Sequence, residues 1–350
     1  GGTVTIDAHA PTNQDAVFST NTSKKGGASV NVVSANETGG SIWFAPYGTT
    51  SFISGDTMTT TGGTATSINS PATAGEYRLF VIDSSGNVSS ASTAVLTVDN
   101  TAPSGYTVTI DQTYINNSNK GALSFTFGGA ELGSTYNYSI SSSGGVGTVT
   151  GSGTISSATQ QITGVDVSGL NDGTLILSVT LTDVAGNVGA AATDTVEKDI
   201  VAPTITSISL SDYALKVGDT ATVTFTFSEA PVSFTVDDIT VENGTLSDFA
   251  VTSDTKIYTA TFTPTDDLEH ASNVISVGTG WTDAAGNAPI AQTNSANYTI
   301  DTKEPTITSI TSNATSPGWL KIGDTITFTL TPGATELGAT AYGYYNGVQL

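Results

Sequence analysis

Acidic residues recur along this sequence in motifs of nearly constant spacing. An Asp followed four residues later by Pro occurs at Asp7, Asp99, Asp199 and Asp301, at intervals of 92, 100 and 102 residues. The pattern Asp-x-x-Gly-Asn begins at Asp83, Asp183 and Asp283, at intervals of 100 and 100 residues. Two motifs with the same period indicate tandem repeats of about a hundred residues each.

A glutamate forms a third motif in the same register. In each repeat an alternating, strand-like run is followed by a Glu, which lies 30, 32, 30 and 35 residues after the linker Asp. These glutamates are Glu37, Glu131, Glu229 and Glu336. Carboxylates are the hard oxygen ligands that Ca²⁺ prefers. The chemistry indicated is therefore cation binding, provided that the fold brings the three motifs together.

The segments between the motifs are predicted to be short β-strands. In the second repeat the candidate strands are 106–110, 122–127, 135–140, 146–150, 160–165, 174–182 and 189–196. Short strands with turn signals about every ten residues are typical of an immunoglobulin-like (Ig-like) sandwich. We expect an all-β chain of tandem Ig-like Greek-key β-sandwiches arranged as an elongated rod. The expected domains are 1–98, 99–198 and 199–300, with the N-terminal half of a fourth at 301–350.

The order of the strands predicts where the motifs meet. With strands named A to G, the linker Asp enters at one pole, the Glu lies in the BC loop, and Asp-x-x-Gly-Asn forms the FG loop at that pole. Their oxygens, with the Asn side chain or carbonyls of its turn, would supply the about six to eight ligands of Ca²⁺. The predicted ligands are Asp7, Glu37, Asp83, Asp99, Glu131, Asp183, Asn187, Asp199, Glu229, Asp283, Asn287, Asp301 and Glu336. The EF loop of a preceding domain adds Asp172, Asp266 and Asp267 as candidates.

Each motif also has a purely structural interpretation. Asp-x-x-Gly-Asn is an ordinary hairpin turn, in which Asp caps the turn and Gly or Asn takes a positive φ. Asp-x-x-x-Pro is an ordinary linker, in which Pro keeps the entry into strand A extended. Only the convergence of both motifs with a Glu in every repeat favours a metal site.

Composition excludes several classes of function. The chain has 9 Lys plus Arg against 31 Asp plus Glu, a formal net charge of −22. Nucleic acid and anionic membrane surfaces both require clustered cations, so neither is an expected partner. An excess of carboxylates suits a calcium-rich surrounding, although it also keeps long extracellular proteins soluble.

An enzyme is not expected. The only histidines, His9 and His270, fall at non-equivalent positions of different repeats, and no nucleophile elbow, paired histidine ligands or phosphate-binding glycine loop is present. The chain contains no cysteine, so stability must come from core size, metal or repetition. No run of 18 apolar residues is present, and we expect no membrane insertion in this segment.

Several segments resemble a known family. LTDVAGNVGAAATDTVEKDIVAPTIT (181–206), LKVGDTATVTFTFSEAP (215–231) and LFVIDSSGNVSSASTAVLTVDNTAP (79–103) are similar to bacterial Ig-like repeats of large RTX and biofilm-associated surface adhesins. The resemblance implies a non-catalytic, extracellular extender or stalk at the cell surface, cut from a longer chain. Its partners would be neighbouring Ig-like domains, with surface glycan or protein bound through other regions.

Two other functions stay open at this stage. Unpaired edge strands and the half domain at 301–350 are compatible with a self-assembling surface layer or filament. Alternatively, the first repeat is a glycan- or peptide-binding module that uses Trp43, Phe44 and Tyr47. Packing in the core is the competing explanation for these three aromatic residues.

Overall fold

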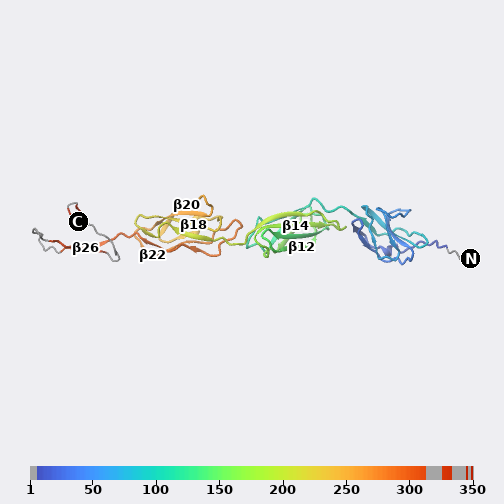
Figure 1. Ribbon diagram of the computed structural model, residues 1–350, viewed down its shortest axis with the longest axis horizontal. Helices are drawn as coiled ribbons and strands as arrows, with labels where there is room; N and C mark the ends of the chain where they lie inside the picture. Colours follow the sequence, from blue (N-terminus) through green and yellow to red (C-terminus); the bar gives the residue numbers. More distant parts are fainter. Residues whose placement is uncertain (1–5, 313–324, 333–343, 346–347, 350) are drawn as a thin grey trace. The chain divides into compact units, whose positions relative to one another are not determined.

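The computed structural model describes residues 6–312, 325–332, 344–345 and 348–349 (Figure 1). The chain divides into two compact units, Gly1–Ile200 and Val201–Leu350. Among the described residues, the first unit contains two separate hydrophobic cores and the second contains one. Nearly all of the regular secondary structure in the described chain is β-strand, as the alternating runs predicted.

The first sandwich packs a large sheet against a small one. The large sheet has the order β1-β7-β6-β3-β4, and the small one pairs β2 with β5. Their bounds are β1 (Thr22–Lys24), β2 (Ser29–Asn31), β3 (Ser41–Pro46), β4 (Thr59–Gly62), β5 (Ser67–Asn69), β6 (Gly75–Ile82) and β7 (Val95–Val98), preceded by one helical turn, α1 (Gln14–Val17). Alternation along β3 sends Ile42 and Phe44 inward, where both are fully buried.

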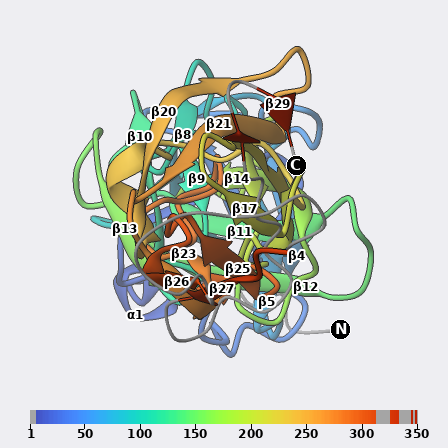
Figure 2. The ribbon, with the colours of Figure 1, turned by 90° about the vertical axis from the view of Figure 1, so that its left-hand side faces the viewer.

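The second sandwich has the strand arrangement of an Ig-like domain. One sheet has the order β13-β10-β8, and the other β12-β11-β14-β15-β9. The strands β8 to β14 are labelled in the turned view (Figure 2). The bounds are β8 (Thr107–Ile110), β9 (Tyr114–Ile115), β10 (Leu123–Gly128), β11 (Thr135–Ser142), β12 (Thr148–Thr154), β13 (Gln161–Val165), β14 (Gly173–Thr182) and β15 (Ala192–Lys198). All seven predicted strands are confirmed within a few residues, and β9 is a short addition that pairs in parallel with β15.

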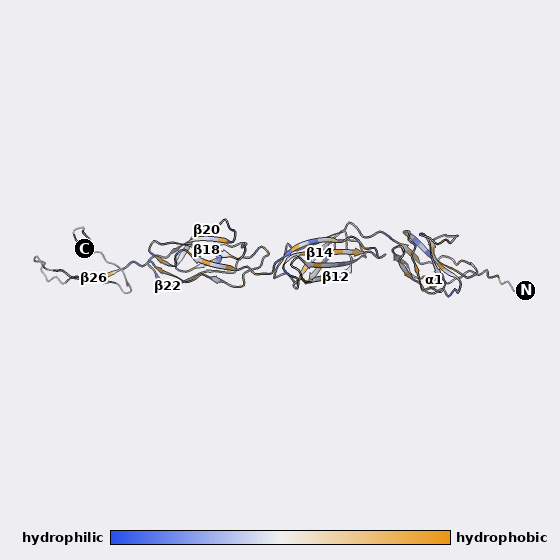
Figure 3. Ribbon diagram, in the orientation of Figure 1, coloured by the Kyte–Doolittle hydropathy of each residue, from blue (hydrophilic) through white to orange (hydrophobic). Residues whose placement is uncertain are grey.

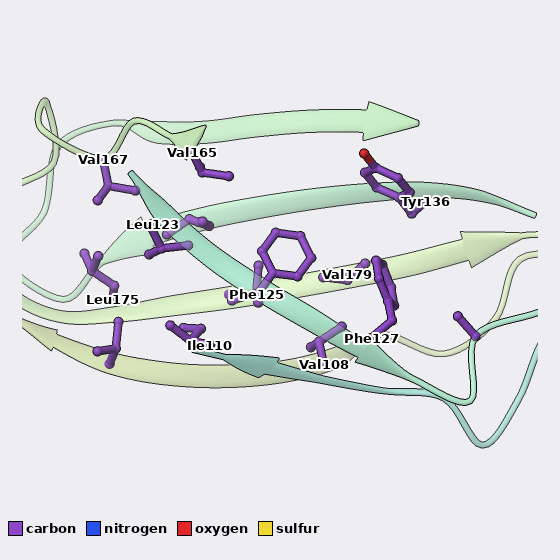
Figure 4. Close-up of a cluster of buried hydrophobic side chains, with 14 of the residues drawn as sticks. Val108, Ile110, Leu123, Phe125, Phe127, Tyr136, Val165, Val167, Leu175 and Val179 are labelled. Atoms are coloured by element: carbon purple, nitrogen blue, oxygen red, sulfur yellow. The ribbon is translucent and has the colours of Figure 1, made fainter. Parts of the chain in front are cut away.

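The core of the second sandwich lies between these two sheets (Figure 4). Leu123, Phe125 and Phe127 alternate along β10 and face Leu175 and Val179 of β14. Hydrophobic residues recur along β14 in the hydropathy view, as expected for a strand with one face in the core (Figure 3). Burying each such side chain stabilises the fold by about 1.5–3 kcal/mol relative to exposure.

The third sandwich has three sheets, with the orders β16-β18-β21-β20, β17-β25-β22 and β19-β23-β24. The bounds are β16 (Ile205–Leu210), β17 (Ala214–Lys216), β18 (Ala221–Phe227), β19 (Ile239–Val241), β20 (Gly244–Val251), β21 (Ile257–Pro264), β22 (Glu269–Asn273), β23 (Ile275–Val277), β24 (Thr293–Asn294) and β25 (Tyr298–Asp301), with a 3₁₀ turn at η1 (Val236–Asp238). Phe227 at the end of β18 meets the Trp281 ring edge-on at a centroid distance of 4.8 Å. This contact ties the BC and FG loops to the core.

The edge strand β20 is interrupted by a bulge. Its register with β21 shifts between Ser247 and Ala250, and Asp248 within the shift has φ of 53°. Asp is one of the few side chains that tolerate this left-handed conformation. The unpaired side of β20 is therefore kinked and carries a charge.

Four further strands, β26 (Ile307–Ser312), β27 (Phe328–Pro332), β28 (Tyr344–Tyr345) and β29 (Val348–Gln349), follow the third sandwich. Residues 313–324 and 333–343 lie outside the described residues. Most of the predicted fourth half-domain, including the predicted ligand Glu336, therefore falls outside them.

Candidate metal centre

The Asp-x-x-Gly-Asn motif folds into the same closed FG loop in all three sandwiches. The Asp N–H donates to the Asn carbonyl at 3.1, 3.0 and 3.0 Å, and the Gly N–H donates to the Asp carbonyl at 3.1, 3.2 and 3.2 Å. The glycines Gly86, Gly186 and Gly286 have φ of 89°, 97° and 89°, a region that only Gly enters freely. The hairpin-turn interpretation of this motif is thereby confirmed.

Within each loop the Asp carboxylate is held by the Asn. Oδ1 of Asp83, Asp183 and Asp283 accepts the Asn N–H at 2.8 Å, and Oδ2 accepts the Asn Nδ2–H at 2.8 Å. In the first sandwich, the side-chain hydrogen bond from Asn87 is the largest cause that lowers the pKa of Asp83 below 3.8; burial opposes it, and three backbone N–H groups assist it. The loop thus favours a charged carboxylate, the form that binds metal.

The same Asn reaches the linker that enters its own sandwich. Asn87 Nδ2 donates to the Asp7 carbonyl at 3.1 Å, and Asn187 Nδ2 donates to the Asp99 carbonyl at 2.8 Å. The linker and the FG loop therefore lie together in both sandwiches, where the predicted topology placed them. The sequence suggested Asn as an oxygen ligand and did not anticipate this donor role.

The BC loop lies against the FG loop as well. A Cβ added to Gly40 would meet the Ile82 carbonyl oxygen at 2.4 Å and Asp83 Cα at 3.2 Å, so glycine is required for this close approach. Glu37 belongs to the same loop, because Gly40 N–H donates to the Glu37 carbonyl at 3.1 Å. In the second sandwich, a Cβ added to Gly133 of the BC loop would lie 3.8 Å from a methyl group of Val184 in the FG loop.

The third sandwich gathers its three carboxylates into a group. Oxygens of Asp199, Glu229 and Asp283 all lie within 4.8 Å of one another, with Asp283 buried and the other two half-buried. Across the described residues, no other set of three His, Cys, Asp or Glu side chains meets this distance. The glutamates that correspond to Glu229 differ in burial: Glu131 of the second sandwich is exposed, and Glu37 of the first is half-buried.

Loop length offers a signal for this difference. Glu229 comes two residues after Phe227, whose ring is anchored against Trp281, whereas Glu131 comes four residues after Phe127. The shorter connection restricts the carboxylate of Glu229 to the pole of the sandwich.

The donor set of the third sandwich fits Ca²⁺. Three carboxylates offer hard oxygen atoms, and each ionised oxygen keeps lone pairs beyond those used in the Asn287 hydrogen bonds. Residues 199–300 contain 13 Asp and Glu but only Lys216 and Lys256 as cations. A divalent cation would offset the mutual repulsion of carboxylates at this spacing.

Other predicted ligands occupy different surroundings. Asp301 ends β25 and is exposed, as are Asp266 and Asp267. Asp172 accepts a hydrogen bond from the buried Lys198 ammonium at 3.2 Å, and its Oδ2 accepts the Ile200 N–H at 3.3 Å. Asp172 therefore anchors the exit of its own sandwich.

Among the histidines and aromatic candidates, His9 lies beside a predicted ligand, because its main-chain N–H donates to Oδ1 of Asp7 at 3.0 Å. His9 is fully exposed, and His270 Nδ1 contacts Asn273 Oδ1 at 2.9 Å. Phe44 is a core residue. Trp43 packs edge-on against Phe52 at 5.7 Å, while Tyr47 is 80% exposed beneath the Arg78 guanidinium at 5.8 Å.

No helix among the described residues has the length and apolar character needed to cross a membrane. No protein of curated function matches the sequence. Among solved structures, a tetra-tandem repeat in the extending region of a large adhesion protein is 19% identical, with 78% of this chain and 69% of that chain covered and a TM-score of 0.28. A 1.5-MDa bacterial ice-binding adhesin, described for host cell surface retention, is 19% identical over 84% of this chain and 96% of that chain, with a TM-score of 0.31.

Chicken CNTN1 FN1–FN3 domains are 12% identical over 80% of this chain and 96% of that chain, with a TM-score of 0.25. The family comparison is specific to one region, because residues 199–300 match the model of the bacterial Ig-like domain. The third sandwich is thus similar in sequence to bacterial Ig-like domains, as the resemblance implied.

Proposed function

We propose that this chain is a non-catalytic, extracellular extender segment of a large bacterial surface adhesin, and that Ca²⁺ bound where the chain enters its third sandwich stiffens that entry. The observation that carries the proposal is the close grouping of three carboxylates, those of Asp199, Glu229 and Asp283. The match of residues 199–300 to the bacterial Ig-like domain supports the adhesin assignment. The domains would be 1–98, 99–198, 199–300 and the start of a fourth from 301.

The physical role follows from where the ligands belong. Asp199 lies in the linker, whereas Glu229 and Asp283 lie in the loops after β18 and before β24. A cation shared by them would tie the linker to the loops, and without the cation their charges would repel. Ca²⁺ would thereby restrict the freedom of the linker without any new protein contact.

The proposed sites of the first two sandwiches use Asp7, Glu37 and Asp83, and Asp99, Glu131 and Asp183. Because the carboxylates there are not grouped as closely, we expect weaker binding than in the third sandwich. A bound cation would require the Glu side chain to turn toward the FG loop.

Terbium luminescence tests the third site directly, because Trp281 lies two residues from Asp283 and can sensitise a bound lanthanide. The full chain is titrated with Tb³⁺ and then with Ca²⁺ in competition. Glu229→Gln keeps the shape of the side chain and removes one charge, so the sensitised emission should fall sharply. Asp248→Asn is the matched control, since it removes an exposed carboxylate on β20 and Asn tolerates the positive φ there.

Unchanged emission in Glu229→Gln would contradict a site at these residues. Equal losses in Glu229→Gln and Asp248→Asn would show that the lanthanide binds the acidic surface at large. Calorimetric titration with Ca²⁺ on the same variants supplies the stoichiometry.

A further inference from the structure

The linker between the first and second sandwiches is held by hydrogen bonds from both sides. The Asp99 N–H donates to the Lys24 carbonyl of the first sandwich at 3.0 Å. The Asp99 carbonyl accepts the Asn187 side-chain N–H of the second sandwich at 2.8 Å. One residue of the linker therefore bonds to both neighbouring sandwiches through its main chain alone.

The next linker residue strengthens the connection to the first sandwich. Asn100 Oδ1 accepts the Gly26 N–H at 2.7 Å, and its Nδ2 donates to the Ala72 carbonyl at 2.8 Å. The Lys25 N–H, beside this site, donates to the carbonyl of Ala185 in the FG loop of the second sandwich at 2.9 Å. These bonds use main-chain groups and an uncharged amide, so none of them requires a cation.

The later part of the linker is docked on the second sandwich. A Cβ added to Gly189 would lie 2.4 Å from the Pro103 carbonyl oxygen, which shows how closely the two backbones approach. The Tyr106 hydroxyl accepts the Leu181 N–H at 3.1 Å and donates to the Ala190 carbonyl. The linker therefore lies along the end of β14 and the segment that leads into β15, up to the start of β8.

We propose that the Asp99–Tyr106 linker is locked by this set of hydrogen bonds, with Asn187 as the central residue, and that its order does not depend on metal. The charge of Asp183 orients Asn187, because Asp183 Oδ2 accepts one Asn187 Nδ2–H while the other N–H reaches Asp99. The FG motif of the first two sandwiches then has a role distinct from cation binding, which is to fasten the incoming linker by an amide.

Spin labels across the linker test this proposal, and the absence of native cysteine makes specific labelling possible. Cysteines replace the exposed Ser51 in the first sandwich and Thr159 in the second, in the full chain. The distribution of inter-label distances is measured by pulsed electron resonance with Ca²⁺ and with chelator. We expect a narrow distribution in both conditions, and loss of the narrow distribution in Asn187→Ala.

Two further variants keep the test decisive. Asn87→Ala makes the same change in the first FG loop, where the amide holds Asp7 instead, and should leave the distribution narrow. Gly189→Ala displaces Pro103 without altering Asn187 and should broaden the distribution, even if Asn187→Ala proves unstable.

A broad distribution for the unsubstituted chain in chelator would overturn the proposal, as would a narrow one in both Asn187→Ala and Gly189→Ala. The terbium experiment measures cation binding at the third sandwich, away from the Asp99–Tyr106 linker. Failure of the calcium proposal is therefore distinguishable from failure of this one.

Discussion

The side-chain amide of Asn187 bridges two residues that are 84 positions apart in sequence, since it donates to Oδ2 of Asp183 and to the main-chain carbonyl of Asp99. Asp183 is buried and accepts three N–H bonds from its own loop. The carboxylate thus acts first on the loop and, through Asn187, on the linker. Loop order and linker order are coupled in this arrangement.

Replacing Asp183 by Ala should loosen the linker without unfolding either sandwich of the first unit. The change leaves the buried N–H group of Asn187 without its acceptor, a loss of about 1–3 kcal/mol in the free energy of unfolding. Chemical denaturation measures that loss, and small-angle scattering measures the linker. Glu131→Ala removes an exposed carboxylate of the same sandwich and should leave stability in chelator unchanged; a comparable loss there would contradict the assignment.

Calcium should raise the thermal stability of the third sandwich. A ligand that binds only the folded state adds about 2.7 kcal/mol at a concentration of 100 times its Kd. Differential scanning calorimetry with millimolar Ca²⁺ and with chelator should show this shift, and Glu229→Gln should reduce it. If both proteins shift equally, the stabilisation arises elsewhere on the acidic surface.

The Asp83 carboxylate should contribute stability that disappears in acid. Its pKa lies below the ordinary value of 3.8, chiefly because the Asn87 amide donates to it. The contribution is therefore complete above pH 3.8 and is lost as the pH falls through the folded pKa. Carbon-detected NMR titration of the Asp carboxyls should show the Asp83 pKa rising toward 3.8 in Asn87→Ala, and an unchanged pKa would refute this cause.

At alkaline pH, Tyr298 should ionise late. Burial, helped by the negative charge of Glu242, raises its pKa from 10.0 to about 12. Its contribution to stability is complete below pH 10 and is lost as the pH rises through the folded pKa of about 12. The ultraviolet titration curve of Tyr298→Phe, subtracted from that of the unsubstituted chain, isolates this phenol; a midpoint near 10 would contradict its burial.

Much of the fold could be predicted from the sequence, because each strand alternates and each turn carries its own residues. Leu123, Phe125 and Phe127 indicate both the strand and its buried face. Ig-like topology predicted that the linker and the FG loop lie side by side, and the hydrogen bond from Asn187 to Asp99 confirms this. The distances between carboxylates could not be predicted in this way, because they depend on side-chain rotamers and BC-loop length.

The burial of Lys198 and the identity of its partners could not be predicted from the sequence. It is 2% exposed, with its ammonium bonded to the Leu170 carbonyl and Asp172. Alternation along β15 places Lys198 on the same face as Val196, which was the available signal. A buried cation is stable only with such partners, and these come from a loop 26 residues away that the pattern does not identify.

The bulge at Asp248 has a consequence for a chain made of many similar domains. Neighbouring sandwiches in one polypeptide are present at high local concentration, and an open edge strand can pair with that of another domain during folding. The kinked, charged edge of β20 offers poor geometry for such pairing. One aspartate in a left-handed conformation thus disfavours exchange of β20 with the edge strand of another repeat.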